Sequence, residues 1–144
     1  MRALIVGLVV AGALVACSNS TEVRDGAKLA LDQHQSEWEQ RTFGSYQYNL
    51  DLQDGSFAKK VHIAVNGTAV VSVVDTAGRN VTGAYQYPTI DDLFATAQAD
   101  FGQANTTLQV EFDQQYGYPT TLIVTTSTGD AVYSAHASNL APGP

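Results

Sequence analysis

The fold prediction rests on residues 45–55, which read Ser-Tyr-Gln-Tyr-Asn-Leu-Asp-Leu-Gln-Asp-Gly. Large apolar side chains occupy every second position of Tyr46 to Leu52 and polar side chains stand between them, which is the pattern of a strand with one buried face. Asp54-Gly55 is a typical tight-turn pair, and the alternation resumes over residues 57–65. The stretch therefore predicts an antiparallel hairpin with one face in the core and one polar face.

Four further segments resemble strands. Residues 70–74 follow a second turn pair, Asn66-Gly67, and residues 108–113, 120–126 and 131–137 lie later in the chain. In residues 108–113 three apolar side chains alternate with Gln109, Glu111 and Asp113, so Glu111 and Asp113 are expected to share the outer face of one strand.

Two segments have the period of an amphipathic helix. One runs from Glu22 to Arg41, and its expected buried face carries Ala27, Leu31, His34 and Trp38. We expect the Trp38 ring to fill the core.

The second helix begins after Thr89, a predicted N-cap residue, and Asp92 three positions later completes a capping-box pattern. Asp91 and Asp92 are explained by this position, because carboxylates in the first turn of a helix interact favourably with its dipole. Gly102 is the expected stop.

The predicted order is helix, three strands, helix, three strands. This predicts an α+β domain: a single antiparallel sheet of about six strands with two helices packed on one face. Phe43-Gly44 and Phe101-Gly102 stand at corresponding helix-to-strand junctions, which hints at a repeat of two α-βββ halves.

The N-terminus indicates a secreted, lipid-anchored protein. Arg2 precedes an uncharged run from Ala3 to Ala16, which suits a signal peptide and is short for a membrane span. Leu14-Val15-Ala16-Cys17 resembles a bacterial lipobox, and the resemblance implies cleavage before Cys17, a diacylglycerol thioether on its sulfur and an acyl chain on its amino group. Two or more chains anchor a protein stably. The alternatives are a secreted protein with a chance cysteine and an uncleaved helical anchor.

These patterns divide the chain into four parts. We expect a lipoprotein signal peptide over residues 1–16, the lipidated cysteine and a tether over 17–22, a single α+β domain over 23–140, and a disordered tail over 141–144. The expected location is the bacterial cell envelope. If the host is Gram-negative, we expect the outer membrane, on its periplasmic side. In enterobacterial sorting, Asp directly after the lipidated cysteine favours the inner membrane, and by analogy Ser18 at that position does not.

The charge pattern bears on partners. The full chain has seven bases and fourteen acids, and residues 1–16 contain one of the bases, Arg2, and no acid. The processed chain would therefore have six bases, fourteen acids and a formal charge of −8. This balance argues against nucleic-acid binding. No Lys or Arg follows Arg79, whereas six acids do, so a basic envelope protein would be steered to the second half of the domain. Solubility and repulsion from anionic lipid explain the same asymmetry without a partner.

No pattern points to catalysis, a cofactor or a metal. Cys17 is the only cysteine, so neither an intrachain disulfide nor a cysteine-based zinc site can form. His34, His62 and His136 lack the spacing of metal ligands, and no Gly-x-Ser-x-Gly, phosphate loop or dinucleotide fingerprint occurs. We therefore assign no catalytic residue, no metal ligand and no cofactor.

Four of the seven tyrosines lie in two loop segments: Tyr85, Tyr87, Tyr116 and Tyr118. Tyrosine is enriched at interfaces because it buries a large ring and keeps a hydrated hydroxyl. The four residues are therefore possible partner-binding residues, or alternatively a lid on the open end of the core. Of the pair around Gly117, we expect Tyr118 to be buried and Tyr116 to be exposed.

Four segments together resemble the DUF6174 family of bacterial envelope lipoproteins, a domain of unknown function. They are Ser45-Tyr46-Gln47-Tyr48 after a Trp-bearing helix, Tyr87-Pro88-Thr89-Ile90-Asp91-Asp92-Leu93-Phe94, Phe112-Asp113 followed by Tyr116-Gly117-Tyr118-Pro119, and Asp130-Ala131-Val132-Tyr133. The likeness covers about residues 37–140. Many relatives carry a pair of cysteines near the end of the first strand, which is absent here. The resemblance implies a fold and a compartment, and no activity.

The combined patterns favour a lipid-anchored, non-enzymatic binding or accessory domain whose partners are the membrane and another envelope protein. The alternative is an envelope enzyme whose site is not visible as a motif. A deep pocket that gathers His62 or His136 with acids would favour the enzyme. An exposed and purely polar sheet face would favour the accessory role.

Overall fold

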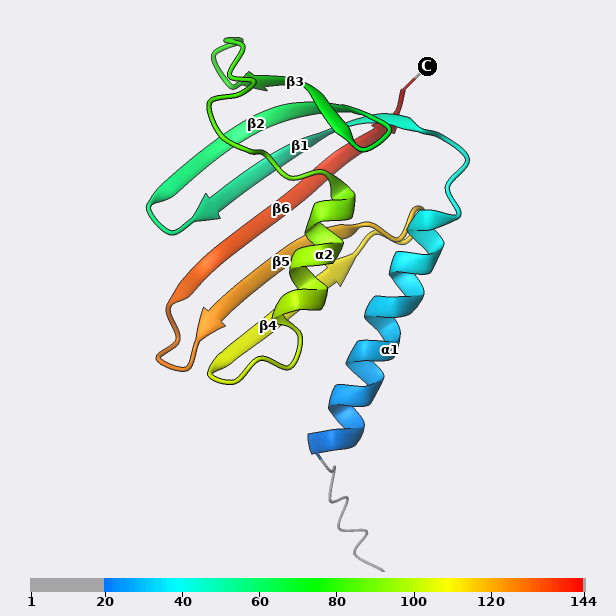
Figure 1. The fold of residues 1–144 in the computed structure, drawn as a ribbon, viewed down its shortest axis with the longest axis vertical. Coiled ribbons are helices and arrows are strands. Elements are labelled where there is room, and N and C mark those ends of the chain that lie inside the picture. The colour runs from blue at the N-terminus through cyan, green and yellow to red at the C-terminus, as the bar shows by residue number, and fades with distance from the viewer. Residues whose placement is uncertain (1–19, 144) are drawn as a thin grey trace, which may run out of the picture.

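The computed structural model describes residues 20–143, with side chains from residue 26 onward (Figure 1). A single six-stranded antiparallel sheet carries two helices on one face, which confirms the predicted fold class and element order. The elements are α1 (Ser20–Glu39), β1 (Ser45–Asp54), β2 (Phe57–Asn66), β3 (Ala69–Asp75), α2 (Ile90–Asp100), β4 (Thr106–Phe112), β5 (Pro119–Thr126) and β6 (Ala131–Pro142).

The strands follow the spatial order β3-β2-β1-β6-β5-β4, so the first and last strands of the chain pair at the centre of the sheet. Neighbouring strands are antiparallel throughout. β1 and β4 therefore run in opposite directions, three places apart, while α1 and α2 contact the same sheet face. To superpose the first half on the second, strand direction would have to be reversed while strand order and the helix-covered face are kept, and no rotation does this. The two Phe-Gly pairs therefore do not mark a structural repeat.

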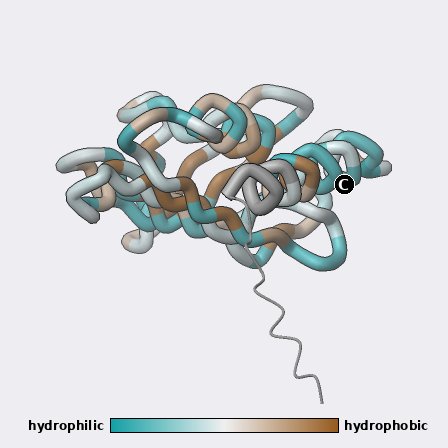
Figure 2. Tube along the Cα trace, turned by 90° about the horizontal axis from the view of Figure 1, so that it is seen from below, coloured by the Kyte–Doolittle hydropathy of each residue, from teal (hydrophilic) through white to brown (hydrophobic). Residues whose placement is uncertain are grey.

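Trp38 joins the first helix to the sheet. Its side chain is completely buried, as predicted. The ring packs edge-on against Tyr46 of β1, with ring centroids 5.2 Å apart, and the indole N–H donates to Asp91 Oδ1 of α2 at 3.1 Å. Trp38 therefore contacts both the sheet and the second helix. In Figure 2 the hydrophobic stretches of the chain lie toward the middle of the molecule, along strands and helices.

The second helix begins as the sequence predicted. The Thr89 backbone N–H donates to Asp92 Oδ2 at 2.8 Å, and the Asp92 backbone N–H donates to Thr89 Oγ1 at 3.1 Å. The backbone N–H of Ile90 donates to the Tyr46 hydroxyl at 3.1 Å. This closed capping box, together with the bond to Tyr46, fixes where the buried face of α2 meets the centre of the sheet.

Both ends of the described chain are more ordered than predicted. Helix α1 begins at Ser20, inside the expected tether, and β6 continues through Pro142, inside the expected tail. Asn139 adopts a positive φ of 53° at an irregularity of the β1–β6 ladder, which allows pairing to resume beyond it. The N–H of Gly143 then donates to the Ser45 carbonyl at 2.7 Å.

Asp113 differs from its predicted place. The β4–β5 register shifts between Glu111 and Phe112, and the strand ends at Phe112. Asp113 Oδ1 accepts hydrogen bonds from the backbone N–H groups of Gln115 and Tyr116, at 2.9 and 2.7 Å. Glu111 therefore lies on the outer sheet face as expected, whereas Asp113 stabilises a turn.

Candidate binding face

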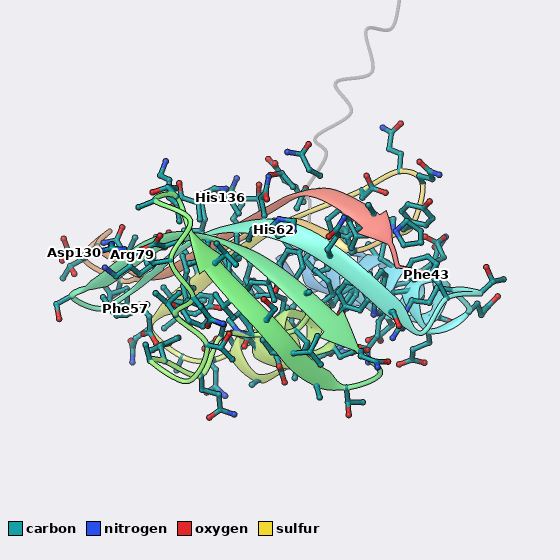
Figure 3. The ribbon with its side chains drawn as sticks, turned by 90° about the horizontal axis from the view of Figure 1, so that it is seen from above. Phe43, Phe57, His62, Arg79, Asp130 and His136 are labelled. Carbon is teal, nitrogen blue, oxygen red and sulfur yellow. The ribbon has the colours of Figure 1, made fainter. Side chains whose placement is uncertain are left out.

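The sheet has one face that no described helix covers, which we call the open face. Strand alternation places mostly polar side chains there, because their neighbours on each strand point into the core. Figure 3 shows His62 and His136 together on this side of the sheet. By register, the open face includes Gln47, Asn49, Asp51, Gln53, Lys60, His62, Ser72, Val74, Gln109, Glu111, Thr121, Ile123, Ser134, His136 and Ser138.

One row of the open face crosses five strands. The registers place Lys60 opposite Asp51, Asp51 opposite His136, His136 opposite Thr121, and Thr121 opposite Glu111. Lys60 Nζ lies 2.8 Å from Asp51 Oδ2, and this hydrogen bond raises the pKa of the ammonium group above its ordinary value. The next contact is looser, since His136 Nδ1 lies 3.5 Å from the Thr121 hydroxyl.

His62 stands between two side-chain amides. Its Nδ1 lies 2.8 Å from Asn49 Oδ1 and its Nε2 lies 3.2 Å from Gln47 Oε1. An amide group has both a donor and an acceptor end, so the pair can hold either tautomer of the ring. The imidazole is therefore fixed in orientation although it is exposed to solvent.

A hollow of about 540 Å³ lies on the open face over β1, β2, the end of β3 and β6. It is wide open to solvent. The two histidines, Asp51, Lys60 and Val74 are among its lining residues. The sequence predicted the polar face from the alternation of β1 and β2, but the meeting of His62 with His136 depends on the β1–β6 pairing, for which the local pattern holds no signal.

The four loop tyrosines pack onto the core to different extents. Tyr87 and Tyr118 are buried, while Tyr85 and Tyr116 are half-buried. Tyr116 is therefore less exposed than predicted, because its ring packs edge-on against Phe43, with centroids 5.4 Å apart. Tyr118 packs edge-on against Trp38, with centroids 6.3 Å apart.

Tyr85 is held by two contacts. Its ring stacks on Phe57, with centroids 4.2 Å apart, and its hydroxyl donates to Asp54 Oδ2 at 2.6 Å. The hydrogen bond to the carboxylate and, to a lesser degree, burial raise the pKa of Tyr85 to about 12. The loop of Tyr85 and Tyr87 and the loop of Tyr116 and Tyr118 therefore pack onto the core as a lid. Of the four rings, those of Tyr85 and Tyr116 remain partly exposed to solvent.

Four of the six acids in the second half of the chain accept hydrogen bonds in a helix or a turn, among them Asp130, whose Oδ2 accepts from the Thr128 hydroxyl at 2.9 Å. Asp91 Oδ1 accepts the Trp38 hydrogen bond, and Arg41 approaches the same carboxylate at 3.5 Å. Asp92 closes the capping box, and Asp113 holds its turn. Glu111, on the open face, is exposed.

The third histidine lies apart from the open face. His34 stacks on Phe112 of β4, with ring centroids 4.2 Å apart, and its Nδ1 lies 2.9 Å from Glu37 Oε2. In the part of the chain that the structure describes, no group of three or more His, Cys, Asp and Glu side chains is placed to hold a metal ion. Cys17, the predicted lipidation site, lies outside the described residues.

The fold and face define a class of protein: a small α+β domain with a helix-covered face and an open polar face. The chain belongs to DUF6174, a family of unknown function, whose model matches residues 30–142. Comparison with curated proteins and with solved structures gave no match. Among residues 20–143, neither helix has the length and apolar character needed to span a membrane.

Proposed function

We propose that this protein is a lipid-anchored domain of the bacterial envelope that binds another envelope protein through its open face, without catalysing a reaction. The observation that carries the proposal is the uncovered row of hydrogen-bonding side chains around the hollow. Many antiparallel sheets leave one face in water. Here, however, the exposed groups are held in place, His62 by two amides and Asp51 by Lys60.

Held side chains favour binding for an energetic reason. Ordering a flexible side chain at an interface costs about 0.5–1.5 kcal/mol, and part of this cost is already met on the open face. The formal charges of the row nearly cancel, so we expect hydrogen bonds to dominate recognition there. The acidic remainder of the domain would steer a basic partner towards it.

The membrane anchor rests on the lipobox at Leu14 to Cys17. Because α1 is described from Ser20 onward, at most two residues lie between the proposed lipidated cysteine and the helix. We therefore propose that the N-terminal end of α1 stands next to the membrane. Growth with a clickable palmitate analogue should label the wild-type protein and leave Cys17→Ala unlabelled, and label on that variant would contradict the anchor.

An envelope enzyme is the competing function, and one observation favours it: the hollow gathers both histidines with Asp51. The detailed contacts favour binding instead. Asp51 is paired with Lys60, and within residues 26–143 no hydrogen bond joins it to His136. The Thr121 hydroxyl lies 3.5 Å from His136 Nδ1, at the outer limit of a hydrogen bond, so this pair does not have the close contact of a nucleophile with its base.

Site-specific photo-crosslinking in intact cells tests the binding face. A benzophenone amino acid at position 138, an exposed position beside the hollow of the open face, is compared with one at the position of Ala95, which is exposed on α2. We expect a discrete adduct with one envelope protein from position 138 only. His136→Glu in the same chain should weaken that adduct, and Thr96→Glu on α2 should not. Equal adducts from both positions, or an adduct unaffected by His136→Glu, would exclude the open face as the binding site, whatever the palmitate labelling shows.

A further inference from the structure

The two edge strands of the sheet differ in whether another part of the described chain covers their outer backbone groups. At the β3 edge the chain folds back over its own strand: the Val81 N–H donates to the Val73 carbonyl at 2.9 Å, and the Val73 N–H donates to Thr82 Oγ1 at 2.8 Å. The Asp75 N–H donates to the Arg79 carbonyl at 2.9 Å. The loop of residues 76–82 therefore occupies backbone groups that an edge strand otherwise exposes.

The opposite edge, β4, has no such cover in the described chain. Its ladder partner is β5, and it is the last strand of the sheet. Its sequence, Thr-Thr-Leu-Gln-Val-Glu-Phe, contains neither Pro nor Lys, which are residues that commonly block pairing at an edge. The register is regular from Thr106 to Glu111, so this length of strand offers its free backbone groups to an added strand.

An apolar groove of about 320 Å³ lies beside this edge, between β4 and α1. The stack of His34 on Phe112 attaches α1 to the end of β4, and the N-terminal half of the helix then diverges from the strand (Figure 1). Leu108 and Val110 are consequently only half-buried. The helix side of the groove is lined by Ala27, Ala30 and Leu31, and the two small alanines leave it room for further side chains.

The surroundings of the groove are acidic. Glu111 lies on the open-face side of β4, and Asp100 lies at its helix-covered end. Among the α1 side chains that the structure describes, the basic one near the groove is Lys28, which is paired with Asp32. No Lys or Arg follows Arg79 in the chain, so β4 and its neighbours contribute no positive charge. A partner segment at this edge therefore gains from carrying basic side chains.

We propose that β4 accepts an extended segment of a partner protein as a seventh strand of the sheet. Alternate side chains of the segment are apolar and fill the groove below α1, and the intervening ones include Lys or Arg beside Glu111. Strand addition of this kind takes affinity from backbone hydrogen bonds and specificity from pockets for alternate side chains. The groove shares no lining residue with the hollow of the open face. Glu111 also ends the row on the open face, so the groove-filling variants are the ones that test this edge independently of the proposed function.

The test uses the full-length protein in detergent and a labelled peptide of about nine residues, within the usual length range of a strand, in which Val and Lys alternate. Fluorescence anisotropy should show binding, and amide hydrogen exchange should slow over residues 106–112. A peptide of the same composition with its Val and Lys residues in two blocks should bind at least about tenfold more weakly, because it cannot present one apolar side.

Matched variants locate the site. Ala27→Trp fills the groove and should weaken binding of the alternating peptide about tenfold or more, whereas Leu29→Trp, at a position that is 68% exposed, should have no effect. Glu111→Lys should weaken binding about fivefold through the lost cross-strand charge pair, while Asp130→Lys, in the β5–β6 turn, should not. Circular dichroism confirms that each variant is folded, and Ala30→Trp replaces Ala27→Trp if that variant is not.

Three results would overturn the proposal. Equal binding of the blocked peptide would show attraction by charge alone. Binding unaffected by the folded groove-filling variant would place the peptide elsewhere. Sedimentation of the protein alone as a dimer, with exchange protection of residues 106–112 that Glu111→Lys removes, would assign the edge to a second copy of this chain.

Discussion

At the scale of single residues, the packing of the core depends on side chains that contact more than one helix or strand. Trp38 contacts β1 through Tyr46 and α2 through Asp91. Arg41 adds a cation–π contact, its guanidinium carbon lying 4.2 Å from the Trp38 ring centroid. Aromatic truncations at such positions remove both buried area and specific contacts.

Trp38→Ala should lower the free energy of unfolding by about 3–5 kcal/mol, as large aromatic truncations in cores do. Urea denaturation followed by far-UV circular dichroism measures this loss. Trp38→Phe keeps most of the packing and loses the hydrogen bond to Asp91, so it should cost clearly less. Because small domains hold about 5–15 kcal/mol in total, an unchanged midpoint for Trp38→Ala would show that the ring is not in the core.

The two tyrosines around Gly117 should respond differently to truncation. Tyr118→Ala removes a buried ring and should cost about 3 kcal/mol or more, whereas Tyr116→Ala removes a half-buried ring and should cost about 1 kcal/mol. Denaturant titration of both variants gives the comparison. Equal losses would contradict the structure. If only Tyr116→Ala also changed crosslinking to a partner, the exposed part of its ring would belong to a binding edge.

At the scale of elements, two short motifs set where secondary structure begins and turns. The capping box of Thr89 and Asp92 starts α2. Gly117, with a φ of 73°, turns the chain between β4 and β5. A Cβ atom at position 117 would lie 3.1 Å from the His34 carbonyl oxygen, so this turn requires glycine both for its φ and for its close approach to α1.

Thr89→Ala should destabilise the protein by about 1–2 kcal/mol, because it leaves an N-terminal amide of α2 without its side-chain acceptor in a buried place. Thr96→Ala, within the same helix, is the matched control and should be neutral or slightly stabilising, since Ala has the higher helix propensity. Thermal unfolding of the two variants side by side is the measurement. A similar effect of both substitutions would mean that the cap contributes nothing specific.

At the scale of the whole molecule, the sheet gathers buried tyrosines whose ionisation is linked to folding. Burial raises the pKa of Tyr46 to about 12, against the lowering effect of the Ile90 N–H, and raises that of Tyr48 well above its ordinary value of 10.0. In the unfolded chain both hydroxyls titrate near pH 10. Above that pH the unfolded chain loses protons that the folded one keeps.

Stability should therefore be at its full value below pH 10 and fall as the pH rises from 10 towards 12. Tyr46 alone should contribute a loss of about 3 kcal/mol across this range. Urea midpoints at a series of alkaline pH values measure the fall, and absorbance at the phenolate band shows how many of the seven tyrosines ionise only on unfolding. Tyr46→Phe should flatten the profile. A constant midpoint up to pH 12 would contradict the assigned burial.

Local sequence patterns were sufficient to predict the helices and strands of this protein and the polar side of its first strand. Alternation over residues 45–55, the Thr89–Asp92 pair and the Asn66-Gly67 turn act between near neighbours, so they can be interpreted without the tertiary structure. They predicted α-βββ-α-βββ, the burial of Trp38 and the polar side of β1. They misplaced Asp113 and the end of β6, because a register shift and a long-range pairing with β1 decided those positions.

The candidate sites depend on strand order, which alternation does not encode. The pairing of β1 with β6 brings His136 beside Asp51 and close to His62, and the terminal position of β4 leaves an edge and a groove exposed. Both features result from the strand order of the six-stranded sheet. In the β1–β6 pair, residues 79 to 96 positions apart in the chain become direct neighbours, as with Asp51 and His136 or Gln53 and Ser134. Such contacts are selected by the free energy of the whole core, so only the tertiary structure reveals them.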